Sequence, residues 1–314
     1  MTSASRRTAA ALGTAAVGVA LWSTLIERRL FTIRRHTLPL LSEGTAPLRI
    51  LQLSDLHLAP WQTNKINWVR SLAGLRPDLV VLTGDLMGHL EARAALLHAL
   101  QPLTEVSPVV FVHGSNDYYT PHLKNPLKYL MEPSRLSTRK PDIDNAKLTS
   151  GLEKLGCINL NNAAATLQLR DTQLELLGLN DPHIRYDNVD AMRESLALVT
   201  SSSSSGSDAA SASPLRIGVV HAPYQEPLGE LLSDGADLIL AGHTHGGQVR
   251  VPGVGALTSN CDLPTAQARG LSVWYDAHRA AFLNVSAGLG NSIYAPVRFA
   301  CRPEASLITL EPAK

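Results

Sequence analysis

The sequence has few cysteines and almost no net charge. It contains 314 residues, of which three are cysteines. Because three is an odd number and Cys157, Cys261 and Cys301 show no C-x-x-C spacing, neither a disulfide framework nor a zinc ribbon is expected. Lys and Arg number 28 against 27 Asp and Glu, which leaves a formal net charge of +1. Without a strong field of one sign, no nucleic-acid partner is expected.

Short apolar runs recur along the chain, each bounded by turn residues. The runs are LRILQL, DLVVL, PVVFVH, LRIGVV and ADLILA. Runs of this length that are β-branched or rich in leucine are typical of buried strands in an α/β sheet. Residues 65–75 and 89–103, which separate the first three runs, have apolar residues at helical intervals. The pattern predicts an α/β fold, in which ligands bind outside the carboxyl ends of the strands.

Each of these five runs is followed by residues that can bind a metal ion. They are Asp55, His57, Asp85, Asn116, His221, His243 and His245. Carboxylate, amide and imidazole groups together suit Mn, Fe, Zn or Co, whereas a calcium site would be nearly all oxygen and a structural zinc site would be rich in cysteine. One carboxylate can bridge two ions, and two ions about 4 Å apart can activate water for displacement at phosphorus. The sequence therefore predicts a two-metal hydrolytic site.

The candidate ligands lie in five short sequence motifs, or boxes. In chain order these are D-x-H, G-D, a G-N-H-D-like box, a lone His and G-H-x-H. This order resembles the calcineurin-like metallophosphoesterases, in particular their membrane-associated branch, over about residues 48–310. The resemblance implies an α/β/β/α sandwich with a dinuclear metal site, and hydrolysis of a phosphodiester, phosphomonoester or pyrophosphate bond. It further implies that the first metal ion is held by Asp55, His57, Asp85 and His245. The second ion would be shared by Asp85 with Asn116, His221 and His243.

The third box departs from the family pattern. The family usually has G-N-H-D or G-N-H-E, whereas this chain has Gly114-Ser115-Asn116-Asp117. In one register Ser115 stands where the metal-binding Asn should be, and Asn116 replaces the histidine that protonates the leaving group. In the other, which we favour, Asn116 remains the ligand and Asp117 takes the place of the acid. Either way the usual acid is missing, and positioned proton transfer typically contributes about 10² to 10⁴ in rate.

Other histidines could replace the missing acid, namely His183, His89 and His122. His183 lies in a D-P-H segment similar to one in membrane-associated family members, although it could instead be a turn histidine after Pro182. His89 could equally begin a helix as a solvated residue. Two rival hypotheses stay open. One is a catalytically weak metal- or phosphate-binding module that has lost its acid, and the other treats the histidines as incidental core residues.

Further features surround the predicted site. The glycines Gly242, Gly246 and Gly247 permit tight turns that bring His243 and His245 toward a common ion. Residues 286–292 follow a strand-like run and could form another active-site loop. Arg298 could contact phosphate, because guanidinium pairs well with its oxygens, or it could form a structural salt bridge. His113 is expected to pack in the interior.

The N-terminal region contains an uncharged stretch from Thr8 to Ile26. Its length is about one bilayer span, and no convincing small-x-small cleavage site follows it. An uncleaved membrane anchor is the first expectation, with a signal peptide or a soluble helix as alternatives. Arginines are more numerous after the stretch than before it, which places the catalytic domain in the cytoplasm by the positive-inside rule. An exported orientation stays open, because Ser5-Arg6-Arg7 faintly resembles a twin-arginine signal.

These features divide the chain into two regions. Residues 1–47 are expected to form the anchor and a basic juxtamembrane segment, and residues 48–314 the phosphoesterase domain. Within that domain, residues 201–213 are a low-complexity run expected to be a surface insertion, and residues 118–145 are long enough to be a cap or substrate loop. The expected partners are the membrane and a phosphate ester, either a small molecule or a lipid-linked phosphate or pyrophosphate.

Overall fold

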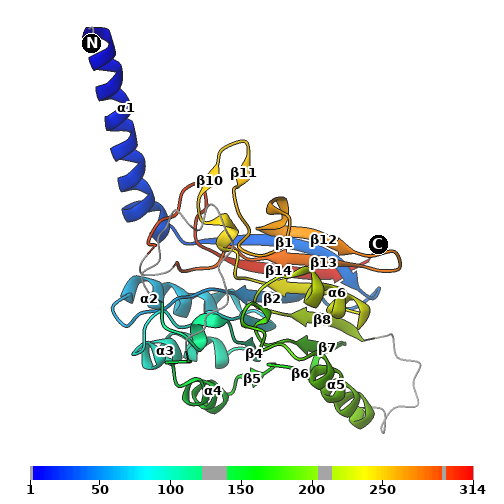
Figure 1. Cartoon of the computed structure of the whole chain (residues 1–314). Helices are drawn as coiled ribbons and strands as arrows, with labels where there is room; N and C mark the ends of the chain where they lie inside the picture. The colour runs from blue at the N-terminus through cyan, green and yellow to red at the C-terminus, as the bar shows by residue number, and fades with distance from the viewer. Residues whose placement is uncertain (1–2, 122–139, 204–213, 292–294, 314) are drawn as a thin grey trace.

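The computed structural model describes residues 3–121, 140–203, 214–291 and 295–313. Within these ranges two six-stranded sheets pack face to face and carry helices on their outer faces (Figure 1). The α/β sandwich that the sequence predicts is confirmed.

The first sheet carries three of the five predicted site loops. Its strand order is β1-β14-β2-β3-β4-β5. The strands are β1 (Thr32–Leu41), β14 (Glu304–Pro312), β2 (Leu48–Leu53), β3 (Leu79–Thr83), β4 (Val109–Val112) and β5 (Ile158–Asn159). Strands β2 to β5 run parallel, and β14 is antiparallel to β2. Helices α2 (Thr63–Ser71), α3 (Arg93–Thr104) and α4 (Asn145–Lys154) pack on its outer face. The loops that leave β2, β3 and β4 therefore meet at one edge.

The second sheet carries the other two site loops. Its strand order is β12-β13-β9-β8-β7-β6. The strands are β12 (Gly270–Tyr275), β13 (Ala280–Val285), β9 (Leu238–Ala241), β8 (Leu215–Val219), β7 (Thr172–Gly178) and β6 (Ala163–Leu169). Strands β7, β8 and β9 run parallel. Helices α5 (Val189–Ser203) and α6 (Gln225–Ser233) pack on its outer face.

The core between the sheets follows from the alternation of side chains along each strand. In β2, Leu48 and Ile50 pack between the sheets, whereas Leu51 and Leu53 pack against the helices. The next inward position is Gln52, which is fully buried. It accepts a hydrogen bond from the Asn284 amide at 2.7 Å and donates one to the Ala241 carbonyl at 2.8 Å. These bonds hold the two sheets together just below the site loops.

Part of the segment before residue 48 belongs to the first sheet. Residues 32–41, which the sequence analysis placed in the juxtamembrane segment, form β1, and β1 pairs in parallel with β14 as the edge strand of the first sheet. Leu38 and Leu41 are buried in the core between the sheets. The arginines of this segment conceal the strand pattern, because an edge strand tolerates charged side chains on its exposed face.

Two predicted segments lie largely outside the described residues. The expected cap at 118–145 is described only at its two ends, and His122 is outside the described part. Of the low-complexity run, residues 201–203 complete α5 and residues 204–213 fall outside.

The N-terminal helix α1 (Ser3–Leu21) projects away from the sandwich in Figure 1. It continues through one π-helical turn (Trp22–Ile26) and a 3-10 turn (Glu27–Arg29). The span Ala10–Arg29 is long and apolar enough to cross a membrane, and only 11% of it is buried. By length and composition it fits a membrane anchor or a signal sequence.

A small hairpin projects from the same side of the sandwich as α1 (Figure 1). It is formed by β10 (Arg250–Val251) and β11 (Gly255–Ala256), which pair antiparallel.

Candidate metal centre

Five loops at adjoining strand ends carry the candidate ligands. Their backbones turn sharply, with positive φ at five ligand positions: Asp55 (48°), His57 (39°), Asp85 (53°), His243 (67°) and His245 (50°). This conformation is costly for residues other than glycine and concentrates at functional sites. Two glycines allow the loops to approach. A Cβ on Gly242 would clash with Ser54 Oγ, and one on Gly288 would meet Asp55 Cβ at 2.6 Å. Gly288 belongs to the 286–292 segment that was expected to border the site.

The first group of donors consists of Asp55, His57 and His245, whose ligand atoms all lie within 4.8 Å of one another. The Nε2 atoms of His57 and His245 are 3.2 Å apart, and His245 Nε2 lies 3.6 Å from Asp55 Oδ1. Asp85 adjoins this group, because its Oδ2 is 3.4 Å from His57 Nε2. Burial lowers the pKa of His57 to about 4 and that of His245 well below its usual range. Both imidazoles are therefore neutral near pH 7, the form that binds metal.

The second group consists of Asp55, Asp85 and His221. His221 Nδ1 donates to the Thr83 carbonyl at 2.7 Å, and its Nε2 lies 3.5 Å from Asp85 Oδ1. Although burial favours the neutral imidazole, the neighbouring Asp85 carboxylate raises the pKa of His221 well above its usual range, so this ring would lose its Nε2 proton on binding a metal ion. Asp85 thus faces His57 with one oxygen and His221 with the other, as a bridging carboxylate would. Although burial favours its protonated form, His221 holds the pKa of Asp85 well below its usual range. Burial raises the pKa of Asp55 to about 6.

Several buried polar atoms in these groups have no hydrogen-bond partner. They include Asp55 Oδ1 and His221 Nε2. Leaving a buried polar atom unsatisfied costs about 1–3 kcal/mol, and more for a charged group. Because both atoms point into clusters of carboxylate and imidazole donors, a divalent cation would satisfy them. The donor set therefore fits metal ions of the type expected from the sequence.

The third box places Asn116 rather than Ser115 beside Asp85. The Asn116 side-chain amide donates to Asp85 Oδ2 at 2.7 Å, and its backbone N–H donates to Asp85 Oδ1 at 2.7 Å. The Ser115 hydroxyl accepts one long contact from the Asn116 amide, at 3.4 Å, and makes no hydrogen bond to Asp85 within the described part of the chain. This geometry favours the register in which Asn116 is the ligand.

Asp117 is fully buried and is engaged by backbone groups. Its Oδ1 accepts from the N–H groups of Leu86 and Met87, and its Oδ2 accepts from that of Gly114. The carboxylate thereby joins the loop after β3 to the loop after β4. These bonds favour a role in positioning Asp85 and Asn116 over a role as proton donor.

His243 lies beside the two groups but belongs to neither. Its backbone N–H donates to Asp55 Oδ2 at 3.0 Å, while its Nε2 lies 3.2 Å from the carbonyl oxygen of Asn260. Its ring is 5.2 Å from that of His221 and 4.6 Å from that of His183. Burial lowers the pKa of His243 well below its usual range.

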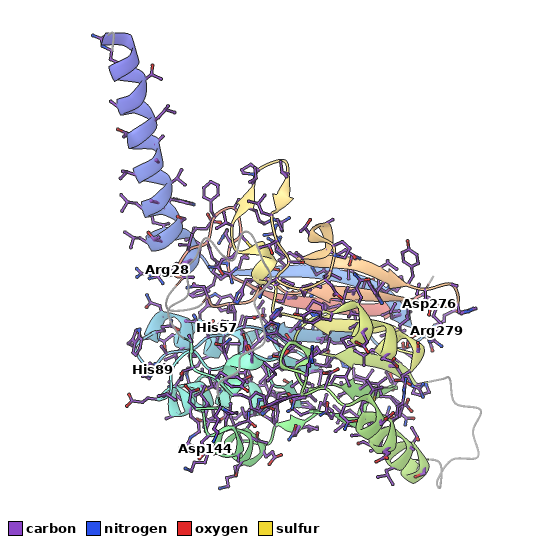
Figure 2. The ribbon with its side chains drawn as sticks, in the orientation of Figure 1. Arg28, His57, His89, Asp144, Asp276 and Arg279 are labelled. Atoms are coloured by element: carbon purple, nitrogen blue, oxygen red, sulfur yellow. The ribbon has the colours of Figure 1, made fainter. Side chains whose placement is uncertain are left out.

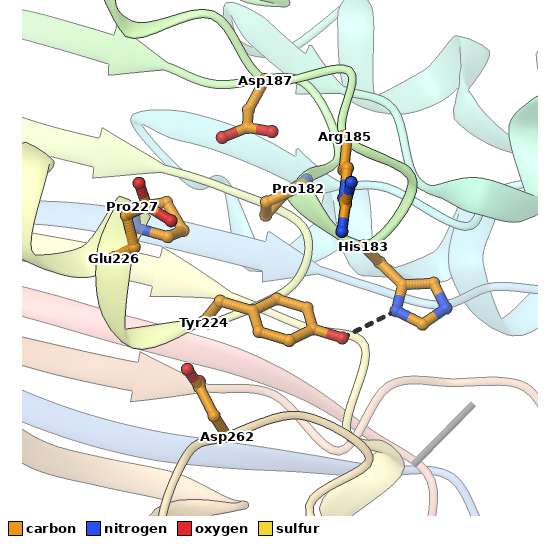
Figure 3. A pocket seen from close by; sticks show the side chains of 8 residues that line it. All are labelled: Pro182, His183, Arg185, Asp187, Tyr224, Glu226, Pro227 and Asp262. Atoms are coloured by element: carbon orange, nitrogen blue, oxygen red, sulfur yellow. Dashed lines mark hydrogen bonds between the residues drawn. The ribbon is translucent and has the colours of Figure 1, made fainter. Parts of the chain in front are cut away.

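Of the two candidate acid histidines that the structure describes, His183 and His89, it is His183 that lies beside the donor groups, with its ring 4.6 Å from that of His243. The Nδ1 of His183 is 2.9 Å from the Tyr224 hydroxyl, and both side chains line a cavity of about 470 Å³ (Figure 3). The other lining residues are Pro182, Arg185, Asp187, Glu226, Pro227 and Asp262. His89 lies elsewhere, with its ring packed edge-on against Trp61 near the periphery of the molecule (Figure 2). The expected interior position of His113 is confirmed.

The sequence analysis did not predict the burial of three residues near the centre. Asp181 is fully buried, its Oδ2 has no partner, and burial raises its pKa to about 7. Lys65 donates to the Leu56 carbonyl at 2.7 Å, and burial lowers its pKa to about 7. Arg298 is completely buried rather than facing solvent. The only available signal was the position of Asp181 in the N-D-P-H segment, since the burial of Lys65 and Arg298 depends on distant elements.

Arg298 supports the loop that borders the first donor group. Its Nη2 donates to the carbonyls of Ala287 at 2.7 Å and Gly288 at 3.2 Å and lies 3.4 Å from His245 Nδ1. No carboxylate pairs with it among the described residues, so the structural salt bridge considered for it is not present in that part of the chain.

A two-sheet sandwich with a buried Asp/His cluster at its strand ends defines a metallophosphoesterase. The model of the calcineurin-like phosphoesterase family matches residues 48–247, and the chain belongs to this family. It is therefore a hydrolase of phosphoric ester bonds, in a family that typically uses two divalent metal ions.

Several proteins of known sequence are similar over most of their length. An uncharacterized protein, YpbG of Bacillus subtilis, is 27% identical over 281 residues, covering 88% of this chain and 87% of that protein. The phosphodiesterase YaeI of Escherichia coli is 27% identical over 285 residues, covering 89% and 88%. The UDP-2,3-diacylglucosamine pyrophosphatase LpxG of Chlamydia trachomatis is 26% identical over 327 residues, covering 91% of each chain.

Proposed function

We propose that this protein is a two-metal phosphoesterase that acts at a membrane on a lipid-linked phosphate or pyrophosphate. The observation that carries the two-metal part is the pair of buried, unpartnered ligand atoms Asp55 Oδ1 and His221 Nε2. Both residues belong with Asp85 to one group of donors, and Asp55 also belongs to the group of His57 and His245. Such a cluster is costly by itself and becomes favourable when cations occupy it.

In this proposal Asp85 would be shared by two metal sites. Asp55, His57, Asp85 and His245 would hold the first ion, and Asp85, Asn116, His221 and His243 the second. His243 joins the second set if its ring turns away from Asn260. The ions are Mn, Fe, Zn or Co. When bound, two such ions lower the pKa of a water toward neutrality and stabilise charge on the phosphoryl oxygens.

The protein's own residues supply orientation and proton transfer. Asn116 orients Asp85 through its two hydrogen bonds, and Asp117 holds both loops in register. We assign His183 as the proton donor to the leaving group, since Tyr224 orients its ring and the adjoining cavity can hold the departing alcohol or phosphate. This assignment replaces the histidine that the third box lacks.

The membrane part of the proposal is supported by α1 and by the relatives. The described helix offers an apolar span from Ala10 to Arg29 next to the catalytic domain. LpxG, whose name describes a pyrophosphatase acting on a diacylated sugar nucleotide, is similar along nearly the whole chain. An anchored domain facing the cytoplasm would meet such substrates at the bilayer surface.

The test is metal-dependent hydrolysis by the full chain in detergent. After chelation, Mn, Zn or Fe is added back, and metal content is measured together with hydrolysis of an activated phosphodiester and an activated phosphomonoester. We expect turnover that depends on added metal. We expect Asp85→Asn to reduce this turnover by at least about 10²-fold, because loss of a group that only supports a metal ligand already costs up to about 10²-fold and Asp85 is itself a proposed ligand. Asp144→Asn is the matched control, because Asp144 is an exposed residue at the start of α4 and lies away from the site (Figure 2). Turnover that survives both chelation and Asp85→Asn would overturn the proposal.

A second candidate is a catalytically weak metal- or phosphate-binding module. One observation at the third box favours it. The family's acid histidine is absent there, and the Asp117 carboxylate accepts hydrogen bonds from three backbone N–H groups. Stoichiometric metal binding without turnover of either ester, or of a lipid pyrophosphate in vesicles, would select this candidate.

A further inference from the structure

The hairpin formed by β10 and β11 has an exposed apolar tip. The seven residues 251–257, VPGVGAL, contain no charged or hydrogen-bonding side chain. Val254 is 74% exposed, and Val251 and Leu257 are 39% and 48% exposed. We call residues 250–257 the apolar hairpin. Exposed apolar side chains gathered on a protruding element mark an interaction surface.

The tip is preorganised by its turn. The Val254 N–H donates to the Val251 carbonyl at 3.0 Å, and Gly253 has φ of +82°, as a type II turn with proline at its second position requires. The turn therefore presents Val251 and Val254 without further ordering. Its internal hydrogen bond also lowers the cost of taking the backbone out of water.

The base of the apolar hairpin is joined both to the site and to the end of α1. The hairpin begins five residues after His245, and its Arg250 N–H donates to the Phe299 carbonyl at 2.9 Å. The residue before Phe299 is Arg298, whose N–H donates to the Ser23 carbonyl at 3.0 Å. The contact with the hairpin and the contact with the end of the helix are thus made by adjacent residues.

A buried carboxylate strengthens the same junction. Glu27, 4% exposed, accepts from the Cys301 N–H and from the Trp22 indole, both at 2.7 Å. Cys301 Sγ in turn lies 3.3 Å from the His245 carbonyl. The end of α1 is therefore held against the segment that carries His245, and the direction of α1 and that of the apolar hairpin are coupled. Both project from the same side of the sandwich in Figure 1.

We infer that the apolar hairpin enters the interfacial layer of the bilayer that α1 spans, and that this second contact holds the catalytic edge against the membrane surface. The occupant is a lipid bilayer rather than a protein, because the apolar hairpin projects from the same side of the sandwich as the apolar helix (Figure 1). Its three exposed apolar side chains are also far fewer than a specific protein interface of about 20–30 residues a side needs. A short hairpin reaches only the headgroup and upper acyl region, where interfacial elements bury their apolar side chains about 5–10 Å deep.

The inference deepens the proposed function, on which it rests for the anchor and the lipid-linked substrate. Two membrane contacts, α1 and the apolar hairpin, would fix the orientation of the domain relative to the bilayer. A single helix leaves the domain free to tilt and rotate. The phosphoryl group of a membrane lipid would then be presented to the loop of His245 without leaving the bilayer.

The first experiment locates the hairpin tip in the full chain reconstituted in phosphatidylcholine nanodiscs. Val254→Cys carries a bimane label, and the native cysteines Cys157, Cys261 and Cys301 are buried and leave the introduced thiol as the reactive one. Leu198→Cys on α5 is the matched control, since Leu198 is 72% exposed and α5 lies on the other side of the molecule (Figure 1). We expect nitroxide lipids to quench the label at 254 and iodide to quench the label at 198. Equal quenching of both labels by iodide, or protection of the label at 254 from both quenchers, as a second copy would cause, overturns the inference.

The second experiment measures the consequence for catalysis with Val254→Asp and Leu198→Asp. We expect Val254→Asp to lower kcat/KM for a phosphoester lipid in the nanodisc by about tenfold, because an aspartate opposes insertion, and to leave kcat/KM for a soluble activated phosphodiester unchanged. Leu198→Asp should change neither. Equal loss on both substrates overturns the inference. If the wild type hydrolyses neither substrate while the label at 254 is quenched by lipid, the proposed function fails and the membrane contact stands.

Discussion

Asn116 donates hydrogen bonds to both carboxylate oxygens of Asp85, from its side-chain amide to Oδ2 at 2.7 Å and from its backbone N–H to Oδ1 at 2.7 Å. The contact joins the turn after β4 to the turn after β3, and it orients the one carboxylate that faces both donor groups. The altered third box therefore keeps a polar group in contact with Asp85 even though it lacks the family's histidine.

The first prediction concerns this contact. We expect Asn116→Ala to weaken metal binding about 10- to 100-fold, because Asp85 loses a group that orients it. Asn116→His should also lose metal rather than gain activity, since an imidazole would replace the amide beside Asp85. Metal content after dialysis against graded chelator measures both. A rise in turnover in Asn116→His with metal retained would show that the register with Ser115 as the ligand is correct.

The second prediction concerns Asp117. Asp117→Ala leaves three backbone N–H groups in the interior without their acceptor, so we expect a loss of about 2–5 kcal/mol in the free energy of unfolding. Denaturant unfolding in detergent measures it. Ser115→Ala, two residues away on the same turn, should cost much less, because its hydroxyl makes one long contact. Similar stability of the two variants would contradict the role given to Asp117.

The third prediction concerns pH and Asp181, whose pKa burial raises from the usual 3.8 to about 7. Between pH 4 and 7 the folded state binds more protons at this carboxyl than the unfolded state does, so its contribution to stability is present below pH 4 and is lost as pH rises through 7. In chelated protein, Asp181→Asn should therefore be more stable than wild type at pH 8, by on the order of 1–4 kcal/mol, with no gain at pH 4.

The control for this effect is Asp144, which is exposed and whose pKa is lowered by its hydrogen bonds with Lys147. Asp144→Asn should give no gain at pH 8. Thermal unfolding across the pH range separates the two variants, and a gain in Asp181→Asn that is independent of pH would show that the carboxyl does not titrate there.

The fourth prediction concerns His183 as proton donor. We expect His183→Gln to reduce turnover about 10²-fold for a phosphodiester with an alkyl leaving group and only a few-fold for one with a nitrophenolate, which needs no proton. Tyr224→Phe should show the same dependence with a smaller loss, because it removes the group that orients the ring. Equal losses on both esters in His183→Gln would assign the residue a structural role.

The sequence alone located the ligand-bearing turns, because each follows a short apolar run whose strand character is local. Asp55, Asp85 and His221 were placed in this way, and the structure brings them within 4.8 Å of one another. The Gly114-Ser115-Asn116-Asp117 box was recognised as altered but left in two registers. Only the hydrogen bonds to Asp85 distinguish Asn116 from Ser115, and these depend on how two separate loops approach.

By itself, then, the sequence determined the α/β class, the candidate ligands and the apolar N-terminal span, since periodicity, turn residues and a long uncharged stretch are local properties of the chain. The sandwich arrangement was expected only from the resemblance to the metallophosphoesterases. The tertiary structure decided that residues 32–41 are an edge strand, that Asp181, Lys65 and Arg298 are buried, and that the apolar hairpin shares a junction with α1. Each of these depends on which distant segment covers a residue. Burial and long-range hydrogen bonding at Arg298 arise only when β14, residues 286–291 and 295–301, and the end of α1 pack together.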